Sequence, residues 1–207
     1  MSEKPGSEKP ARREATIPKA RLDAITDGIF AFAMTLLVLD LRLPVGFNPK
    51  SGIELVAALR DLQGQYIAYI ISYYVLGLRW LAQVSERGVP EIVSGKYGRW
   101  QLIYLFFITS IPFSTMVVGR YEPLQAATWI YATNMILSGL CSIRLAYLAE
   151  QERGADEHRD RPELATLIAS AVLSVVLSFI TPAHAMWAYL LNIWPYLARF
   201  RRRRQPE

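Results

Sequence analysis

The sequence predicts an all-α membrane protein with six transmembrane helices and both chain ends in the cytoplasm. Hydrophobic residues make up 52% of the 207 residues, and charged residues are absent from long stretches. No Asp, Glu, Lys or Arg occurs in residues 62–78, 100–119, 123–143 or 164–198. A helix needs about 20 mainly apolar residues to cross the bilayer core. These segments are therefore predicted to span a membrane and not to form the core of a soluble domain.

The distribution of basic residues predicts the orientation of the spans. Eighteen Lys and Arg side chains fall in the two terminal tails and in the second and fourth loops, whereas three fall in the alternate loops. Arg60 and Arg79 lie near the ends of the second hydrophobic region. Basic residues collect on the cytoplasmic side of membrane proteins. Both ends are therefore expected in the cytoplasm, which requires an even number of spans and supports six in the plasma (inner) membrane of the cell.

The N-terminal half begins with a polar, Pro-containing stretch, residues 1–17, which is expected to be a disordered cytoplasmic tail. Pro18 suits the first turn of a helix, and Pro44 cannot continue one. Pro112 predicts a kink in the third helix, which neighbouring helices can tolerate. The expected elements are a helix over about 18–43, a short amphipathic segment over 53–63, a second helix over 64–83 and a third over 98–118.

The C-terminal half alternates charged and apolar segments. Residues 150–161 form a strongly charged linker, and residues 181–184 are too short and polar for anything but a turn. The helices expected around them cover 123–145, 162–180 and 185–200. The whole of 18–200 is thus predicted to be one six-helix domain, followed by a basic cytoplasmic tail over 201–207. That tail fits contact with anionic membrane lipid better than binding of nucleic acid.

Side chains that carry catalysis or bind metals are sparse. The chain has two His residues, one in the charged linker and one in a predicted turn, and one Cys, Cys141, inside an apolar segment. The sequence contains no recognisable Ser/His/Asp set and no Gly-rich phosphate loop. Enzymatic activity, a resident metal and a cofactor are therefore not expected.

The first predicted helix carries carboxylates where a membrane span rarely does. Only twelve residues separate Asp27 from Asp40. Twelve helical residues cover about 18 Å, which is shorter than the hydrocarbon core. Asp27 must then lie at or inside the membrane boundary, where an ionised side chain costs about 3 kcal/mol or more unless it is paired or hydrated. This helix is therefore predicted to face protein or water and not lipid.

One stripe of this helix has the spacing of a packing seam. Phe32, Leu36, Leu39 and Leu43 follow one another at intervals of four, three and four residues, as in a coiled coil. Thr35 lies on the edge of the stripe and can hydrogen-bond back to its own helix. From the spacing alone, both a packed core and the surface of a pore remain open for this stripe.

Other faces of the helix carry small and charged residues. Gly28, Ala31 and Ala33 allow close approach of a neighbouring helix. Arg21 and Asp27 are six residues apart and so lie on different faces. Any pairing between these two is expected to run through neighbouring helices or water.

Residues 21–40, which read RLDAITDGIFAFAMTLLVLD, resemble the signature helix of the transmembrane protein 175 family of potassium channels. That signature is usually written Arg-x-x-x-Phe-Ser-Asp, followed by an apolar run that contains Thr. Residues 112–115 (PFST) and 119–121 (GRY) are similar to the family's Pro-Phe-x-Thr…Gly-Arg-Tyr segment. The resemblance covers about 18–148, and the motifs follow in the family's order.

The second helix supplies a further match, and three places depart from the family pattern. Residues 72–73 (SY) and Trp80 resemble the family's Ser-Phe…Trp segment. Residues 25–26 (IT) stand where the family has Phe and Ser, and residues 83–84 (QV) stand where it has one or two His. Phe32 stands where relatives carry Ile or Leu as the narrowest apolar ring.

The resemblance implies a homotetramer in which four copies of the first helix line a central pore for potassium. Such a pore lacks the carbonyl-lined filter of ordinary potassium channels, and the sequence contains no TVGYG run. Phe32, Leu36 and Leu39 would form stacked apolar constrictions that gate the pore. Thr35, together with Ala31, would set the cation preference. The implied partners are further copies of the chain and membrane lipid, and K+ would be a permeant ion, not a cofactor.

The same resemblance implies a structural role for polar residues near the cytoplasmic end. Arg21, Thr26 and Asp27 would hold the first helix against its neighbours, and Trp80 and Gln83 of the second helix would belong to the same polar network. In the family, His residues join Arg and Asp there. Gln83 therefore implies a rebuilt or weaker network in this chain.

A secondary or proton-coupled transporter that uses Asp27 is the alternative hypothesis. Carriers of this kind often contain inverted repeats and helices that break near the membrane midplane. The sequence shows no convincing internal repeat, and Asp27 lies near the end of its helix. Saturable, substrate-coupled flux would indicate a carrier, whereas electrodiffusive current would indicate a channel.

Overall fold

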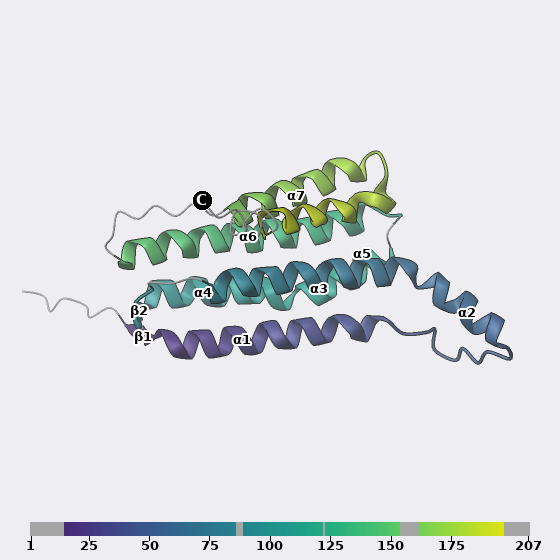
Figure 1. The fold of residues 1–207 in the computed structure, drawn as a ribbon, viewed down its shortest axis with the longest axis horizontal. Helices are drawn as coiled ribbons and strands as arrows, with labels where there is room; N and C mark the ends of the chain where they lie inside the picture. The colour runs from purple at the N-terminus through teal and green to yellow at the C-terminus, as the bar shows by residue number, and fades with distance from the viewer. Residues whose placement is uncertain (1–14, 86–88, 122, 154–161, 197–207) are drawn as a thin grey trace, which may run out of the picture.

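The computed structural model describes residues 15–85, 89–121, 123–153 and 162–196, and nearly all of them are helical. The long helices run along one common axis (Figure 1). The elements in chain order are β1 (Thr16–Pro18), α1 (Lys19–Leu36), η1 (Leu37–Asp40), α2 (Gly52–Asp61), α3 (Gln63–Val84), β2 (Ile92–Ser94), α4 (Gly95–Thr109), α5 (Ile111–Arg120), α6 (Gln125–Arg153), α7 (Pro162–Ser178) and η2 (Pro182–Ile193), where η marks a 3-10 helix.

Four helical segments are long and apolar enough to cross a membrane. They are Lys19–Asp40, Gln63–Val84, Gly95–Arg120 and Gln125–Glu152. The two C-terminal elements are shorter in sequence. The 17 residues of α7 cover about 25 Å, and the 12 residues of η2 cover about 24 Å because a 3-10 helix rises more steeply. The predicted all-helical membrane fold is confirmed, with four full-length spans among the described residues and two shorter elements packed on them.

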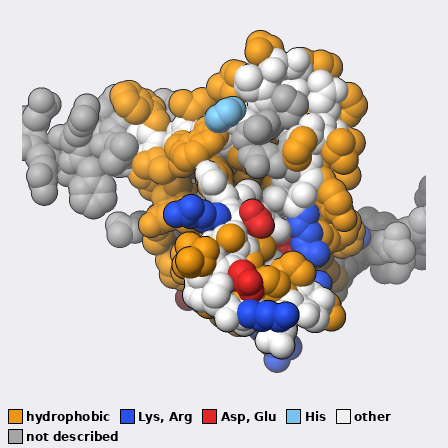
Figure 2. Space-filling model, turned by 90° about the vertical axis from the view of Figure 1, so that its right-hand side faces the viewer, with side chains coloured by type: hydrophobic (Ala, Val, Ile, Leu, Met, Phe, Trp, Pro, Cys, Tyr) orange, Lys and Arg blue, Asp and Glu red, His pale blue; other side chains and the backbone are white. Residues whose placement is uncertain are grey.

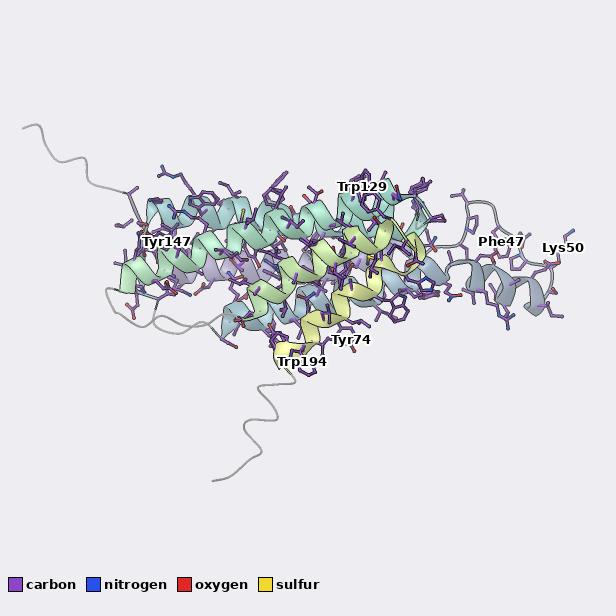
Figure 3. The ribbon with its side chains drawn as sticks, turned by 90° about the horizontal axis from the view of Figure 1, so that it is seen from above. Phe47, Lys50, Tyr74, Trp129, Tyr147 and Trp194 are labelled. Atoms are coloured by element: carbon purple, nitrogen blue, oxygen red, sulfur yellow. The ribbon has the colours of Figure 1, made fainter. Side chains whose placement is uncertain are left out.

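The elements form three layers in Figure 1. Helix α1 is one outer layer, α3 with α4 and α5 is the middle layer, and α6, α7 and η2 form the other outer layer. The core lies between the layers and includes the fully buried side chains Phe30, Leu76, Leu105, Ile108, Tyr131 and Met135. Exposed aromatic side chains, among them Tyr74, Trp129, Tyr147 and Trp194, lie on the outside of the bundle (Figure 3).

The first helix ends earlier than predicted. The sequence placed its end at Leu43, whereas α1 tightens into the 3-10 turn η1 and stops at Asp40. The Asp40 carboxylate accepts a hydrogen bond from Arg120 Nε at 2.8 Å. This tie to α5 turns the chain away from the helix axis before Pro44 is reached.

Residues 16–17, predicted to lie in a disordered tail, belong to a short strand. Residues 1–14 of that predicted tail lie outside the described residues. Strand β1 pairs antiparallel with β2, with Ile17 opposite Val93, and the Lys19 amide donates to the Glu91 carbonyl at 2.8 Å. The partner strand lies more than 70 residues away in sequence, so three residues with no long β pattern could not reveal the pairing.

The predicted kink in the third span is confirmed. Helix α4 ends at Thr109, and α5 begins at Ile111 with Pro112 in its first turn, where a missing N–H is tolerated. Ser110 lies at the break, and its hydroxyl donates to the Phe106 carbonyl at 2.9 Å.

Helix α6 runs to Arg153, eight residues beyond the predicted end at Leu145. The start of the charged linker is therefore helical, and residues 154–161 lie outside the described part of the chain. The last element begins at Pro182 as a 3-10 helix and not at Ala185 as an α-helix. The predicted end of that helix, residues 197–200, and the predicted tail over 201–207 are outside the described residues.

The amphipathic segment predicted over 53–63 is helix α2, which projects from the end of the bundle beyond α3 (Figure 1). None of its residues is buried. Its N-terminus is capped, because the Ser51 hydroxyl accepts from the Glu54 amide at 3.2 Å and the Glu54 carboxylate accepts from the Lys50 amide at 2.7 Å. Phe47 and Lys50 lie on the same projection (Figure 3).

Buried hydroxyl groups join the middle layer to α6. Thr115 of α5 donates to Ser72 of α3 at 2.8 Å, and the Ser72 hydroxyl lies 3.0 Å from the Tyr131 hydroxyl of α6. All three side chains are buried. In an apolar bundle an unpaired hydroxyl is costly, so this chain of hydrogen bonds favours one relative placement of the three helices.

Helices α3 and α5 approach closely at Gly119. A Cβ atom at this position would lie 3.1 Å from the Gln65 Cα and 3.2 Å from the Ala68 Cβ. Both neighbours belong to the backbone region of α3 and cannot move away independently. Glycine is therefore the residue that permits this helix contact.

Replacing Gly119 with valine is expected to lower the free energy of unfolding by about 1–3 kcal/mol, because the added atoms overpack a backbone contact. Thermal unfolding of the purified protein in detergent measures the effect. Gly77→Val is the matched control, since a Cβ at Gly77 meets only the end of the Met34 side chain, at 3.7 Å. A control that loses as much stability as Gly119→Val would contradict the assignment.

Candidate functional site

Helix α1 packs on the rest of the chain along one stripe. Its buried side chains recur every three or four residues, which is the period of one helix face. They contact α3, α4 and α5 of the middle layer. These buried residues are Leu22, Thr26, Phe30, Ala33 and, in η1, Leu37.

The opposite face of α1 is uncovered and carries the residues predicted to line a pore. Phe32 is 68% exposed and Leu39 is 65% exposed. Ala31 and Thr35 are exposed as well, whereas Leu36 is half-buried at the edge of this face. The structure thus brings Ala31, Phe32, Thr35 and Leu39 to one surface and sets Leu36 beside it.

Helix α1 is also the least covered of the four full-length spans. Within its apolar window 22% of the residues are buried inside the chain, compared with 33%, 44% and 56% for the three spans that follow it. Its position as an outer layer explains the difference (Figure 1). A span that carries carboxylates and is so little covered by its own chain has surface left for other copies or for water.

The Thr35 hydroxyl is oriented by its own helix. Its Oγ1 donates to the Phe32 carbonyl at 2.8 Å, and the side chain is exposed. A hydroxyl has one proton and two lone pairs. Because the proton is committed to the backbone, the exposed oxygen presents lone pairs to its surroundings, which is the arrangement a cation requires.

Asp27 is paired with a side chain of a neighbouring helix. The indole Nε1 of Trp80 in α3 donates to Asp27 Oδ1 at 2.9 Å. A hydrogen bond to a carboxylate is stronger than one between neutral groups. This contact joins α1 to α3 near the N-terminal end of α1 and leaves Asp27 exposed at its edge.

Thr26 forms a second, separate contact. Its hydroxyl donates to the Leu22 carbonyl at 2.7 Å and accepts from Gln101 Nε2 of α4 at 2.8 Å. The pair is buried. Sequence reasoning did not identify Gln101, although an amide in an otherwise apolar and charge-free span was a usable signal.

Arg21 and Gln83, predicted to belong to the same network, do not join it. Arg21 is exposed and forms no hydrogen bond or ion pair with any described residue. The Oε1 atom of Gln83 is buried without a partner among the described residues. The polar residues therefore form two separate pairs and not one network, because the α1 stripe that carries Thr26 faces α4 while Asp27 faces α3.

The other end of α1 is held by an ion pair. The Asp40 carboxylate lies 2.8 Å from Arg120 Nε and 2.5 Å from Arg120 Nη2. Two residues of the GRY segment therefore have structural roles. Gly119 permits the approach of α5 to α3, and Arg120 pairs with Asp40. Helix α1 is thus fixed to the middle layer at both of its ends.

Arg79 of α3 is the other polar residue whose place the sequence did not reveal. Its Nη2 donates to the Ser142 hydroxyl at 2.7 Å and to the Ser138 carbonyl at 3.3 Å, both in α6. The guanidinium lies over the Tyr104 ring at 5.2 Å. A single arginine in an apolar segment could have indicated a buried polar contact. Because Arg79 lies near the end of its helix, the sequence analysis placed it at the membrane interface instead.

The surface agrees with this division of polar and apolar groups. In the end-on view of Figure 2, hydrophobic side chains lie around the edge of the molecule and Lys, Arg, Asp and Glu side chains gather on the end face. Within the described ranges no three His, Cys, Asp or Glu side chains come close enough together to hold a metal ion. The site on α1 is therefore a helix surface made of apolar side chains and one hydroxyl.

Comparison with known proteins gives a consistent result. Residues 21–112 match the family model described as endosomal/lysosomal potassium channel TMEM175. A potassium channel of Streptomyces collinus is 30% identical over 124 residues, which cover 58% of this chain and 59% of that protein. A potassium channel of a Chryseobacterium species is 26% identical over 84% of this chain and 89% of its own length.

A solved structure shares the fold. The crystal structure of a lysosomal potassium-selective channel TMEM175 homologue from Chamaesiphon minutus superposes with a TM-score of 0.68 at 23% sequence identity. The superposition covers 86% of this chain and 96% of that chain. The likeness therefore extends beyond the segment matched by the family model and includes the C-terminal layer.

The substitution Trp80→Phe is expected to lower the free energy of unfolding by about 1.5 kcal/mol. It removes the indole donor to Asp27 and keeps an aromatic ring, and the exposed position puts the cost at the low end for a hydrogen bond to a charged group. Thermal unfolding in detergent measures it. Trp187→Phe is the control, because Trp187 is exposed and forms no hydrogen bond within the described part of the chain. Equal losses in both variants would argue against the Asp27 contact.

Proposed function

We propose that this chain is a potassium channel of the TMEM175 family, whose model matches residues 21–112, and that its central pore is lined by four copies of α1. The observation that carries the proposal is the uncovered face of α1, which gathers Ala31, Phe32, Thr35 and Leu39 on one surface. In a ring of four chains around α1, this face turns inward. The TMEM175 family is one of ion channels and not of enzymes.

The uncovered face suits a ring of identical copies better than contact with lipid. Asp27 is exposed near one end of α1, and lipid would contact its carboxylate if this face pointed outward. A closed ring places the same surface of every copy around one axis. Water that enters such a ring hydrates the polar groups near its two ends.

Apolar side chains act as the constrictions of the proposed pore. Phe32 and Leu39 project from α1 about one helical turn to either side of Thr35 and would form two rings, with Leu36 at the wall beside them. A narrow apolar ring gates by losing its water and raises the energy of a hydrated ion. Phe32 is bulkier than the Ile or Leu of relatives, so its ring is the tightest point of the proposed pore.

Thr35 supplies the polar ring between the constrictions. Its hydroxyl proton is bonded to the Phe32 carbonyl, so four copies would direct four oxygen lone pairs toward the axis. A potassium ion gives up water more readily than a sodium ion. A site with few oxygen ligands between apolar rings therefore favours potassium, and Ala31 leaves room beside it for the remaining water.

The proposed topology has six spans with both ends in the cytoplasm of a plasma membrane. The three layers contain six segments that run along the bundle axis, which are α1 with η1, α3, α4 with α5, α6, α7 and η2. The basic residues of the sequence supply the orientation. Exposed aromatic residues such as Trp129 and Trp194 fit the membrane–water interface, where lipid would be the partner.

Alanine at Phe32 is expected to raise potassium conductance severalfold, because it opens the tightest apolar ring. Leu39→Ala should raise it less, and Leu36→Ala least, because Leu36 lies at the edge of the face. Thr35→Val keeps the shape of the side chain but removes the oxygen, and it should lower the preference for potassium over sodium. Ion flux in liposomes that contain the purified protein measures all four variants.

Phe113→Ala is the control for these measurements, because Phe113 is 60% exposed on α5 and lies away from α1. Its conductance and selectivity should equal those of the wild type. Unchanged flux in all the α1 variants would reject the pore assignment. Saturable flux that survives them and disappears in Asp27→Asn would indicate a carrier instead.

Oxidative cross-linking is expected to join copies of the chain through α1. Cys141 is the single cysteine of the sequence, so Cys141→Ser gives a background without thiols. On that background Phe32→Cys should form disulfide-linked dimers in membranes, since its thiols would meet near the axis within the reach of a disulfide. Val172→Cys, on the exposed face of α7, is the control and should stay monomeric. Cross-linking at position 172 and not at 32 would place the interface elsewhere.

A further inference from the structure

We propose that a cavity on the far side of α3 from the proposed pore binds a small hydroxycarboxylate, of the size of lactate, through Arg79. The cavity has a volume of about 100 Å³ and lies between α3, α4, α6, α7 and η2. It is separate from the uncovered face of α1, which contributes no residue to its lining. The proposal therefore does not depend on channel activity.

Arg79 brings a positive charge to this cavity that the described residues do not neutralise. Its Nη2 is bonded to two neutral oxygens of α6, whereas Nε and Nη1 are buried and have no partner. A guanidinium inside an apolar bundle is costly unless an anion and further hydrogen bonds offset its loss of water. The two free N–H groups are therefore suited to the oxygens of a carboxylate.

A second unsatisfied group defines what else the ligand carries. Gln101 lines the cavity and is 2% exposed, and its buried Oε1 has no partner among the described residues. The amide orientation is fixed, because Thr26 gives its own proton to Leu22 and must accept from Gln101 Nε2. Oε1 is thus a buried acceptor that needs a donor, and the hydroxyl group of a hydroxycarboxylate supplies one.

The remaining walls select for a small ligand with an apolar part. Val75, Leu78, Leu145 and Leu167 line the same cavity. A dry cavity of about 150 Å³ accommodates a ligand of six heavy atoms such as benzene. A half-enclosed space of about 100 Å³ therefore suits a molecule of four to six heavy atoms. In the proposed complex the carboxylate of lactate binds Arg79, its hydroxyl binds Gln101 and its methyl group lies against the leucines.

Glu163 also lines the cavity and would repel a carboxylate if its charge were not offset. It lies in the first turn of α7, where the helix dipole stabilises a negative charge. It also has an interaction partner of its own, and this partner is not Arg79, whose Nε and Nη1 are free. The charge of Arg79 thus remains available to a bound anion.

Saturation-transfer NMR on the purified chain in detergent, titrated with sodium lactate, tests the proposal. Lactate is expected to give a saturable signal, and propionate, which lacks only the hydroxyl, is expected to bind about tenfold more weakly because the Gln101 oxygen stays unpaired. Equal binding of the two acids, or no saturable signal for lactate, would overturn the proposal on the wild-type protein alone. Displacement of lactate by equimolar chloride would assign the cavity to small anions in general and would overturn it too.

Variants locate the site. Arg79→Gln is expected to abolish the lactate signal, and Arg99→Gln, which removes the same charge from an exposed position of α4, should leave it unchanged. A lactate signal that survives in a folded Arg79→Gln protein would place the ligand elsewhere and reject the cavity.

Discussion

The hydrogen bond from Trp80 to Asp27 is the contact on which the arrangement of α1 depends. A carboxylate this close to an apolar span must be paired or hydrated, and the indole of α3 pairs it at 2.9 Å. The ion pair of Asp40 with Arg120 does the same at the other end. Two such ties on α1 set its rotation about its own axis. They thereby decide that Phe32 and its neighbours are the side chains left uncovered.

The sequence was informative about which residues could not face lipid and uninformative about their partners. Apolar runs and the positions of charges predicted the helices, and the spacing of Asp27 and Asp40 predicted that α1 is exceptional. The partners lie far away in the chain, since Trp80 is 53 residues from Asp27 and Gln101 is 75 from Thr26. Such contacts depend on how the helices pack in three dimensions, which periodicity within one helix cannot reveal.

The layers differ in how their buried polar side chains find hydrogen-bond partners. The middle layer joins its hydroxyls in the chain from Thr115 through Ser72 to Tyr131. The C-terminal layer bonds Asn192 of η2 to Ser170 of α7 at 2.8 Å, which ties its two short elements to each other. Where this layer meets α3, hydrogen-bond acceptors are too few for Arg79. Its Nε and Nη1 groups have no partner among the described residues, and the residue lines a cavity.

The hydroxyl of Thr35 shows why a structural and a functional role need not compete. A bond back to its own helix is the common fate of threonine in an apolar helix, and it is often taken to satisfy the side chain. The bond uses only the proton, and it fixes the rotamer so that the lone pairs point away from the helix. A hydroxyl that was free to rotate could turn its proton toward the pore and would then repel a cation. In a pore of side chains without a carbonyl filter, the back-bond is therefore what would make threonine a dependable cation ligand.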